Sequence, residues 1–300
     1  MNYDEQALVF DCVGEPSIGI ISRPTGAPEA QTGLLIVVGG PQYRVGSHRL
    51  FVKLARHAAS QGFPAMRFDY RGMGDSWAEL RSFETVHDDV QAAVNAFFRE
   101  VPTLKRVVLW GLCDGASASC MYAPSDKRVQ GLILINPWVH TTEGGAITRL
   151  RHYYVRRLLD GAFWRKVLTG QVGMRAFNVL LDTVRQALAK RIGRSSTRSA
   201  DSSVTNQADA LPLPSRIGHQ VRQSGIPFAM ALSDEDPIAQ EFEDQAMPTP
   251  EWQQAVSRQL IQLARLSNAD HTITSPEVRD QLCQLTVDWM RDLSARSAPP

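Results

Sequence analysis

One cysteine in this 300-residue sequence stands where a thiol could act as a nucleophile. Apolar residues 107–110 predict a buried strand, which continues into Gly111-Leu112-Cys113-Asp114-Gly115 and then into small residues that suit a helix. Small residues two positions before and after Cys113 allow a tight turn that would hold Cys113 in a strained conformation. The N-terminus of the next helix would favour its thiolate. The pattern predicts a nucleophile elbow, and an inert buried cysteine is the alternative.

An attacking thiolate needs a base to take its proton, and His271 is the candidate. It follows the last predicted strand, 261–266, whereas the other histidines fall in predicted helices, at a helix start, or in or beside an insertion. The imidazole needs a carboxylate that fixes its tautomer. Asp236 is the first choice and Asp234 the second, because both follow the predicted strand 227–232. The alternative role of Asp236, which precedes a proline, is to cap the next helix, and it could do both.

An acyl-transfer intermediate also needs two backbone donors that form an oxyanion hole. The N–H of Asp114, directly after the cysteine, is the first candidate. The second should come from the loop after the predicted strand 34–38, where Pro41 lacks an N–H and Gly40 or Gln42 must serve. The carboxylate of Asp114 would oppose thiolate formation unless it points away or pairs with a cation. The possible cationic partners are Arg44, His48, Arg49 and Arg71.

Strands that alternate with helices must position these residues. The pattern predicts a hairpin at 7–12 and 17–22, strands at 34–38, 63–68, 106–112, 129–135, 227–232 and 261–266, and helices near 47–61, 84–99, 252–259 and 276–293. This is an α/β fold with a mostly parallel central sheet and helices on both faces. Ligands bind outside the carboxyl ends of such strands. Cys113, Asp236 and His271 all follow strand ends, so we expect them to meet at one rim.

Composition narrows the function classes. The chain is 43% hydrophobic, which is enough for one large core, and its net charge of +1 argues against polyanion binding by bulk charge. No apolar run suits a transmembrane helix or a secretory signal. The spacing of Cys12, Cys113, Cys120 and Cys283 fits neither a zinc site nor a disulfide framework. We therefore expect a reduced, cytoplasmic setting, with neither a cofactor nor a metal.

The alternation of strands and helices breaks for roughly eighty residues. We interpret 1–139 and 223–300 as the core and 140–222 as a helical lid insertion, with a mobile linker at about 193–212. Residues 149–198 carry twelve basic and two acidic side chains. They could form a solvated face beside acidic neighbours, or a landing surface for an anionic partner such as an acyl carrier protein, coenzyme A, a polysaccharide or a membrane. No nucleic-acid-binding signature accompanies the charge. The candidate substrate- or partner-binding residues are Trp138, Tyr154, Arg156 and Arg157.

Three longer motifs, 38–49, 67–76 and 109–118, together with Ile135-Asn136-Pro137-Trp138, resemble the α/β-hydrolase superfamily. More narrowly, they resemble the exosortase A system-associated hydrolase 1 group, over most of residues 7–290. The resemblance implies a hydrolase fold with Cys113 at the nucleophile position, where the superfamily usually has serine. Dienelactone hydrolase is a relative that also uses cysteine. The departure from serine favours activated acyl groups such as thioesters or lactones.

The resulting hypothesis is an enzyme that hydrolyses an acyl ester or thioester through a covalent acyl-cysteine intermediate. If an alcohol or amine resolves that intermediate, the enzyme is an acyltransferase or a cyclase instead. A non-catalytic member of the fold that docks an acidic partner through its basic insertion is an alternative of another class. A redox sensor at Cys113 is disfavoured, because no second cysteine forms a Cys-x-x-Cys pair with it.

Overall fold

The computed structural model describes residues 2–26, 30–40, 42–140 and 211–296. The chain divides into two compact units, of which one comprises residues 1–141 and 207–300 and the other residues 142–206. The second unit lies outside the described residues. The predictions for Tyr154, Arg156, Arg157, the basic run 149–198 and most of the linker at 193–212 therefore fall there.

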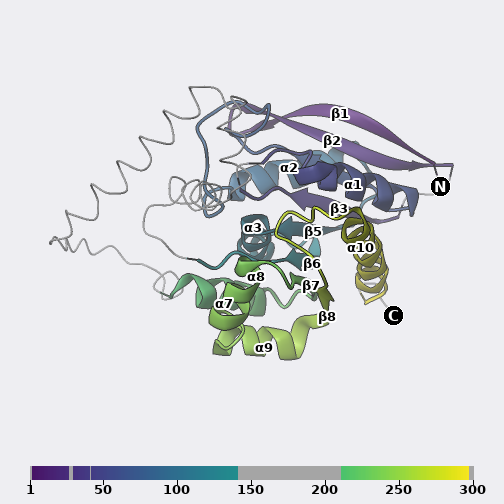
Figure 1. Cartoon of the computed structure of the whole chain (residues 1–300). Helices are drawn as coiled ribbons and strands as arrows, with labels where there is room; N and C mark the ends of the chain where they lie inside the picture. Colours follow the sequence, from purple (N-terminus) through teal and green to yellow (C-terminus); the bar gives the residue numbers. More distant parts are fainter. Residues whose placement is uncertain (1, 27–29, 41, 141–210, 297–300) are drawn as a thin grey trace, which may run out of the picture. The chain divides into compact units, whose positions relative to one another are not determined.

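The core is built on an eight-stranded sheet with the order β1-β2-β4-β3-β5-β6-β7-β8 (Figure 1). The strands β1 and β2 form an antiparallel hairpin, β2 pairs antiparallel with β4, and the pairs from β4 through β8 are parallel. The predicted mostly parallel α/β sheet is thus confirmed. The strands are β1 (Asn2–Cys12), β2 (Glu15–Thr25), β3 (Thr32–Val37), β4 (Ala65–Phe68), β5 (Arg106–Leu112), β6 (Val129–Ile135), β7 (Phe228–Ser233) and β8 (Leu260–Leu266).

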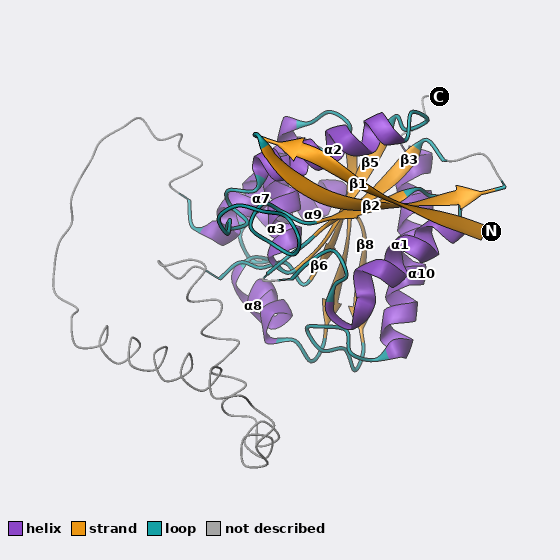
Figure 2. Ribbon diagram, turned by 90° about the horizontal axis from the view of Figure 1, so that it is seen from above, coloured by secondary structure: helices purple, strands orange, loops and turns teal. Residues whose placement is uncertain are grey.

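Continuous apolar runs occupy the middle of this sheet. Every residue of β3 and β7 is buried, because helices cover both faces of a central parallel strand. The edge strand β1 instead exposes most of its residues. In Figure 2, α1 (Leu50–Ser60) and α10 (Pro276–Arg296) lie on one side of the sheet. On the other side lie α2 (His87–Glu100), α3 (Asp114–Tyr122), α7 (Leu213–Ser224) and α9 (Pro250–Gln259), and α8 (Pro237–Gln245) follows β7.

The boundary predicted for the insertion at residue 222 is too late. Helix α7 (Leu213–Ser224) lies within the residues assigned to the lid except for its last two, but it packs against α3 and α9 of the core. Its Ile217 and Val221 are fully buried, and the Trp252 indole of α9 donates a hydrogen bond of 3.0 Å to the Pro214 carbonyl. The helix was missed because its apolar positions are few and lie beside a Ser-rich stretch.

Two other elements differ from the sequence-based prediction. The helix expected from residue 47 begins as a 3₁₀ turn, Ser47–Arg49, in which His48 and Arg49 have positive φ, and α1 starts at Leu50. Helix α8 was not predicted as an element, and only the capping role considered for Asp236 indicated that a helix follows. Within the described part of the chain, no helix is long and apolar enough to cross a membrane.

Candidate active site

Cys113 lies at the sharp turn between β5 and α3. Its backbone has φ 60° and ψ −126°, a region that costs a non-glycine residue about 1–3 kcal/mol. A Cβ on Gly111 would collide with the backbone nitrogen of Ala116, and one on Gly115 would collide with the Val37 carbonyl. The tight turn predicted from the small residues is therefore confirmed. Cys113 directly precedes α3, so the first N–H groups of the helix lie beside it.

The backbone around Cys113 is fixed on both sides. Its N–H donates to the Ile135 carbonyl at 2.9 Å, and its carbonyl accepts from the Trp138 N–H at 3.2 Å. The thiol-bearing residue is partly exposed, whereas Cys12, Cys120 and Cys283 are buried. Among the four cysteines, Cys113 is therefore the one that is not buried.

His271 and Asp236 form a hydrogen-bonded pair. The His271 Nδ1 lies 2.6 Å from the Asp236 Oδ2, and the Asp236 side chain is 1% exposed against 28% for His271. An ionised carboxylate can only accept, so this contact places a proton on Nδ1 and leaves Nε2 as the basic nitrogen. The other carboxylate oxygen of Asp236 accepts from the Ile238 N–H at 2.9 Å and caps α8. Asp236 thus both caps the helix and contacts the imidazole, as its position before Pro237 suggested.

Asp234, the second choice for the carboxylate that orients His271, makes other contacts. Its Oδ1 accepts from the Ala269 N–H at 3.2 Å, and its own N–H donates to the Leu266 carbonyl at 3.2 Å. These contacts tie the loop after β7 to the loop after β8. Asp234 therefore supports the loop that carries His271, while Asp236 contacts the ring.

The strand order brings Cys113, Asp236 and His271 to the same edge of the sheet. They follow β5, β7 and β8, and the strands β5-β6-β7-β8 are consecutive parallel neighbours in the sheet. The intervening strand β6 is linked to both sides: Cys113 donates to its Ile135, and the Asn136 N–H donates to the β7 residue Ala231 at 3.1 Å. The geometry supports the expectation that one rim holds all three residues.

Asn136 is a residue whose role the sequence did not reveal. Its Nδ2 donates to the Ser233 Oγ at 2.9 Å and its Oδ1 accepts from the Ser233 N–H at 2.9 Å. The residue is fully buried and has φ 44°, a conformation that asparagine tolerates better than most residues. The signals in the sequence were its position directly after a predicted strand and its place in the Ile135-Asn136-Pro137-Trp138 motif of the resemblance. Asn136 holds the end of β6 against the end of β7, three residues before Asp236.

We expect Asn136→Ala to lower turnover roughly tenfold, because the side chain that joins the two loops is lost and Ser233 keeps unpaired buried groups. Asn136→Gly separates the loss of the hydrogen bonds from backbone strain, since glycine accepts the positive φ but also lacks the carboxamide. The measurement is steady-state turnover of an activated ester together with thermal unfolding. Asn95→Ala, an exposed asparagine on α2, is the control. Normal turnover in both Asn136 variants would contradict a positioning role.

The oxyanion loop after β3 departs from one prediction. The Gly40 N–H donates to the Asp114 Oδ1, so Gly40 does not offer this group to a substrate in the structure. The backbone N–H of Gln42 stays the candidate for the second donor, and the Gln42 side chain accepts from the Ser47 N–H at 3.2 Å. The Asp114 N–H, at the start of α3, stays the candidate for the first.

Three of the four groups considered for the Asp114 carboxylate have contacts with other side chains. Arg44 pairs with Asp69 and, at 2.6 Å, with Asp75. Arg71 binds Asp89 at 2.9 Å. The His48 Nε2 lies 3.4 Å from the Thr274 hydroxyl, and Arg49 is exposed. The Asp114 carboxylate is buried and directed at the backbone of the loop after β3.

Trp138 lies beside the elbow through its backbone. Its carbonyl accepts from the Ser117 hydroxyl at 2.5 Å, and its indole N–H donates to the His140 carbonyl at 3.1 Å. The His140 Nδ1 is 2.7 Å from the Glu241 Oε1 on α8. The backbone of Trp138 therefore lies beside the elbow, and the role of its side chain in substrate binding stays a prediction.

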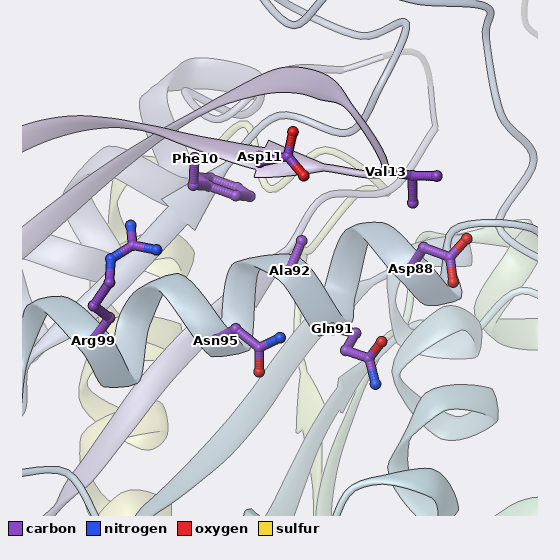
Figure 3. Close-up of a pocket in the computed structure, with 8 residues that line it drawn as sticks. All are labelled: Phe10, Asp11, Val13, Asp88, Gln91, Ala92, Asn95 and Arg99. Atoms are coloured by element: carbon purple, nitrogen blue, oxygen red, sulfur yellow. The ribbon is translucent and has the colours of Figure 1, made fainter.

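A hollow of about 340 Å³ lies elsewhere, between the end of β1 and helix α2 (Figure 3). Phe10, Asp11 and Val13 line it from above, and side chains of α2 line it from below. None of the predicted catalytic residues lines this hollow. Among the residues that the structure describes, no group of three or more metal-ligating side chains gathers.

We expect iodoacetamide near neutral pH to modify Cys113 and to spare the other three cysteines in the folded protein. Burial raises the thiol pKa of Cys12 to about 11, that of Cys283 to about 12 and that of Cys120 further still. Since only the thiolate reacts, their reaction requires strongly alkaline solution or unfolding. Peptide mass spectrometry before and after denaturation checks this. Equal labelling of all four cysteines in the folded protein would contradict it.

Comparison with known proteins agrees with this architecture. The family model Hydrolase_4, described as serine aminopeptidase, S33, matches residues 34–275. An esterase of Pyrococcus furiosus superposes with a TM-score of 0.64 at 11% identity, covering 97% of this chain and 91% of the esterase. The dienelactone hydrolase of Anabaena variabilis superposes with a TM-score of 0.59 at 12% identity, covering 97% and 99%. At such identities these similarities establish the fold.

One curated relative is named for an activity other than hydrolysis. The polyketide transferase grgF of a Penicillium species is 28% identical over 133 residues, which is 41% of this chain. The match spans 43% of that protein's length, which is less than half.

Proposed function

The chain belongs to the Hydrolase_4 family (serine aminopeptidase, S33) of α/β-hydrolases, and from this premise we propose that it is a cysteine-nucleophile acyl hydrolase. Its substrate in this proposal is an ester or thioester, and its intermediate is an acyl-cysteine at Cys113. The observation that carries the proposal is Cys113 at the elbow, on the same sheet edge as a His271–Asp236 pair joined at 2.6 Å.

The chemistry follows from these groups. The Cys113 Sγ attacks the carbonyl carbon while the His271 Nε2 takes the thiol proton, and the carbonyl π pair moves to oxygen. The N–H of Asp114 and a second donor of the oxyanion loop stabilise this oxyanion. Collapse re-forms the carbonyl and breaks the bond to the leaving group, which takes the proton from Nε2. Water then attacks the acyl-cysteine, its proton passes through Nε2 back to Sγ, and the acid is released.

A sulfur nucleophile limits the substrate class. The tetrahedral intermediate collapses by expelling the better leaving group, and a thiolate leaves far more readily than an amine. Acylation by an amide therefore depends on full proton transfer from the His271 Nε2 to the leaving amine, whereas a thioester or an activated ester needs less of this assistance. This favours acyl esters and thioesters over the peptide bonds that the family's description suggests.

The partial match to a polyketide transferase supports a second outcome, in which an alcohol or amine resolves the acyl-cysteine. The proposal extends to acyl groups carried by an acyl carrier protein or by coenzyme A, because both present thioesters. The basic residues that suggested such carriers lie outside the described residues.

The test compares three substrates with the same acyl group: a p-nitrophenyl ester, a pantetheine thioester and a p-nitroanilide. We expect a burst of one product per enzyme and a protein mass increase equal to one acyl group with the ester and the thioester, and neither with the anilide. Added alcohol or amine acceptors, followed by product analysis, measure the share of transfer. Faster cleavage of the anilide than of the ester, or the lack of an acyl adduct with every donor, would overturn the proposal.

A further inference from the structure

The loop that carries His271 contains a strained residue. Ile273 has φ 52°, a region that a β-branched residue rarely adopts, and its side chain is 1% exposed within the hydrophobic core. Such a conformation costs about 1–3 kcal/mol and persists only where the surrounding contacts hold it. Because the strain lies two residues after the candidate base, the contacts that hold this backbone also affect where the imidazole lies.

Asp270, the residue directly before His271, supplies such contacts. Its Oδ1 accepts from the Thr274 N–H at 2.9 Å, and its Oδ2 accepts from the Thr274 hydroxyl at 2.5 Å and from the Thr272 hydroxyl at 3.4 Å. Its carbonyl accepts from the Ile273 N–H at 3.3 Å. The side chain and the backbone of one residue therefore close the turn that contains both His271 and Ile273.

The ionisation of Asp270 strengthens this turn. Burial raises the pKa of its carboxyl group, but the hydrogen bonds of Thr274 and Thr272 outweigh that effect, so the pKa lies below its usual value. The carboxylate is therefore charged near neutral pH, and its bonds to the two threonines are charge-assisted.

The preceding residue, Ala269, binds the neighbouring loop through both of its backbone groups. Its N–H donates to the Asp234 Oδ1 at 3.2 Å, and its carbonyl accepts from the Glu235 N–H at 3.1 Å. Ala269 thus fixes where the loop after β8 begins, beside the loop that carries Asp236, whereas Asp270 fixes how it turns. His271 follows both residues, and its Nδ1 lies 2.6 Å from the Asp236 Oδ2.

We propose that Asp270 is a positioning residue for His271: its bonds to Thr274 hold the strained turn that keeps the imidazole on Asp236. This inference rests on the proposed function of His271 as the base. When these bonds are removed, a change of φ relieves the strain at Ile273, and the ring moves away from Asp236. The proton is then no longer fixed on Nδ1, so Nε2 is no longer reserved as the basic nitrogen.

Three substitutions test this role. Asp270→Ala removes every side-chain contact of the turn, whereas Asp270→Asn keeps a carbonyl oxygen for the Thr274 N–H and places an amide beside the hydroxyls. Thr274→Val removes only the hydroxyl of an exposed residue and keeps its backbone donor. Asp292→Ala, which removes an exposed carboxylate from α10, is the matched control.

The place of the ring is measured by the chemical shifts of its two nitrogens in mildly alkaline solution, where imidazoles are neutral. The spectrum of His271→Gln assigns the signals. We expect the Nδ1–H tautomer in the wild-type chain, in Asp270→Asn and in the control. Asp270→Ala should show a mixture with the Nε2–H tautomer, and Thr274→Val a smaller change in the same direction. The pure Nδ1–H tautomer in folded Asp270→Ala would overturn the proposal.

Acylation by the activated ester at saturating concentration measures the effect on the chemistry. We expect Asp270→Ala to lower its rate about tenfold or more with little change in KM, and Asp270→Asn to stay within about threefold of wild type. A wild-type rate in folded Asp270→Ala would overturn the positioning role. If thermal unfolding shows that this variant does not fold, Thr274→Val decides, and an unchanged tautomer there overturns the proposal.

The failure of the proposed function has a separate readout. If the wild-type chain forms no acyl adduct with any donor, the assignment of Cys113 as nucleophile fails. The tautomer of His271 in the Asp270 variants is measured without substrate, so it still decides whether Asp270 positions the ring.

Discussion

Cys113→Ala is expected to abolish the covalent acyl adduct and to lower turnover of an activated ester at least about 10³-fold. Alanine leaves the carbonyl carbon without an attacking group. Hydrogen in place of the SH group leaves the Cβ, and with it the strain of the backbone turn at φ 60°, unchanged, so we expect only a small change in the free energy of unfolding. Intact-protein mass spectrometry and pre-steady-state product release measure the two effects.

Two further variants complete this experiment. Cys120→Ala removes a buried thiol from helix α3, seven residues from the elbow, and should leave the adduct intact. Cys113→Ser tests whether the site can activate a hydroxyl. The serine variant should retain measurable turnover if His271 acts as the base that takes the proton from the nucleophile. An adduct that persists in Cys113→Ala would refute the assignment of the nucleophile.

Asp236→Asn is expected to lower turnover by about 10²–10⁴-fold while the fold persists. The asparagine carbonyl oxygen can still accept from the Ile238 N–H and cap α8. Its amide then faces the His271 Nδ1 as a donor, so the ring must carry its proton on Nε2 and loses the basic nitrogen needed at Cys113. We therefore expect turnover to fall while the helix cap, and with it the thermal stability, is kept. Steady-state kinetics measure the turnover, and thermal unfolding measures the stability.

Asp236→Ala removes the cap as well as the acceptor, and we expect a further loss of about 1 kcal/mol in the free energy of unfolding. Asp234→Asn is the matched control, since it lies on the same loop and its carboxylate oxygen binds the Ala269 N–H, which an amide oxygen can also accept. We expect the control to keep most of its turnover. A larger loss in Asp234→Asn than in Asp236→Asn would reverse the two assignments.

The alternation of apolar strands with helices could be predicted from the sequence, because each central strand is buried on both faces and so carries an unbroken apolar run. Leu34 to Val38 and Val107 to Trp110 are examples, and both belong to fully buried parts of the sheet. Helix α7 could not be predicted from such a pattern. Its buried Ile217 and Val221 stand among polar residues, and only their packing against α3 and α9 makes the segment part of the core.

The sequence by itself determined the features that depend on neighbouring residues. The spacing of Gly111, Cys113 and Gly115 dictates the sharp turn, since nothing larger than hydrogen fits where β5 meets α3. The residue pair Asp236-Pro237 likewise predicts a helix cap, and the capped helix is present. At Gly111 and Asp236 these properties are local, because the atoms that would collide or that bond, in Ala116 and Ile238, lie within a few residues. The clash at Gly115 is with the Val37 carbonyl of β3 and so depends on the tertiary structure.

Only the tertiary structure decided which distant groups meet. It joins Asp236 rather than Asp234 to His271, sets Asn136 against Ser233, and turns the Asp114 carboxylate to the Gly40 N–H. The physical reason is that these contacts depend on the register of strands that are far apart along the chain. A displacement of one residue between β7 and β8 would carry a side chain to the other face of the sheet, and no local pattern encodes that choice.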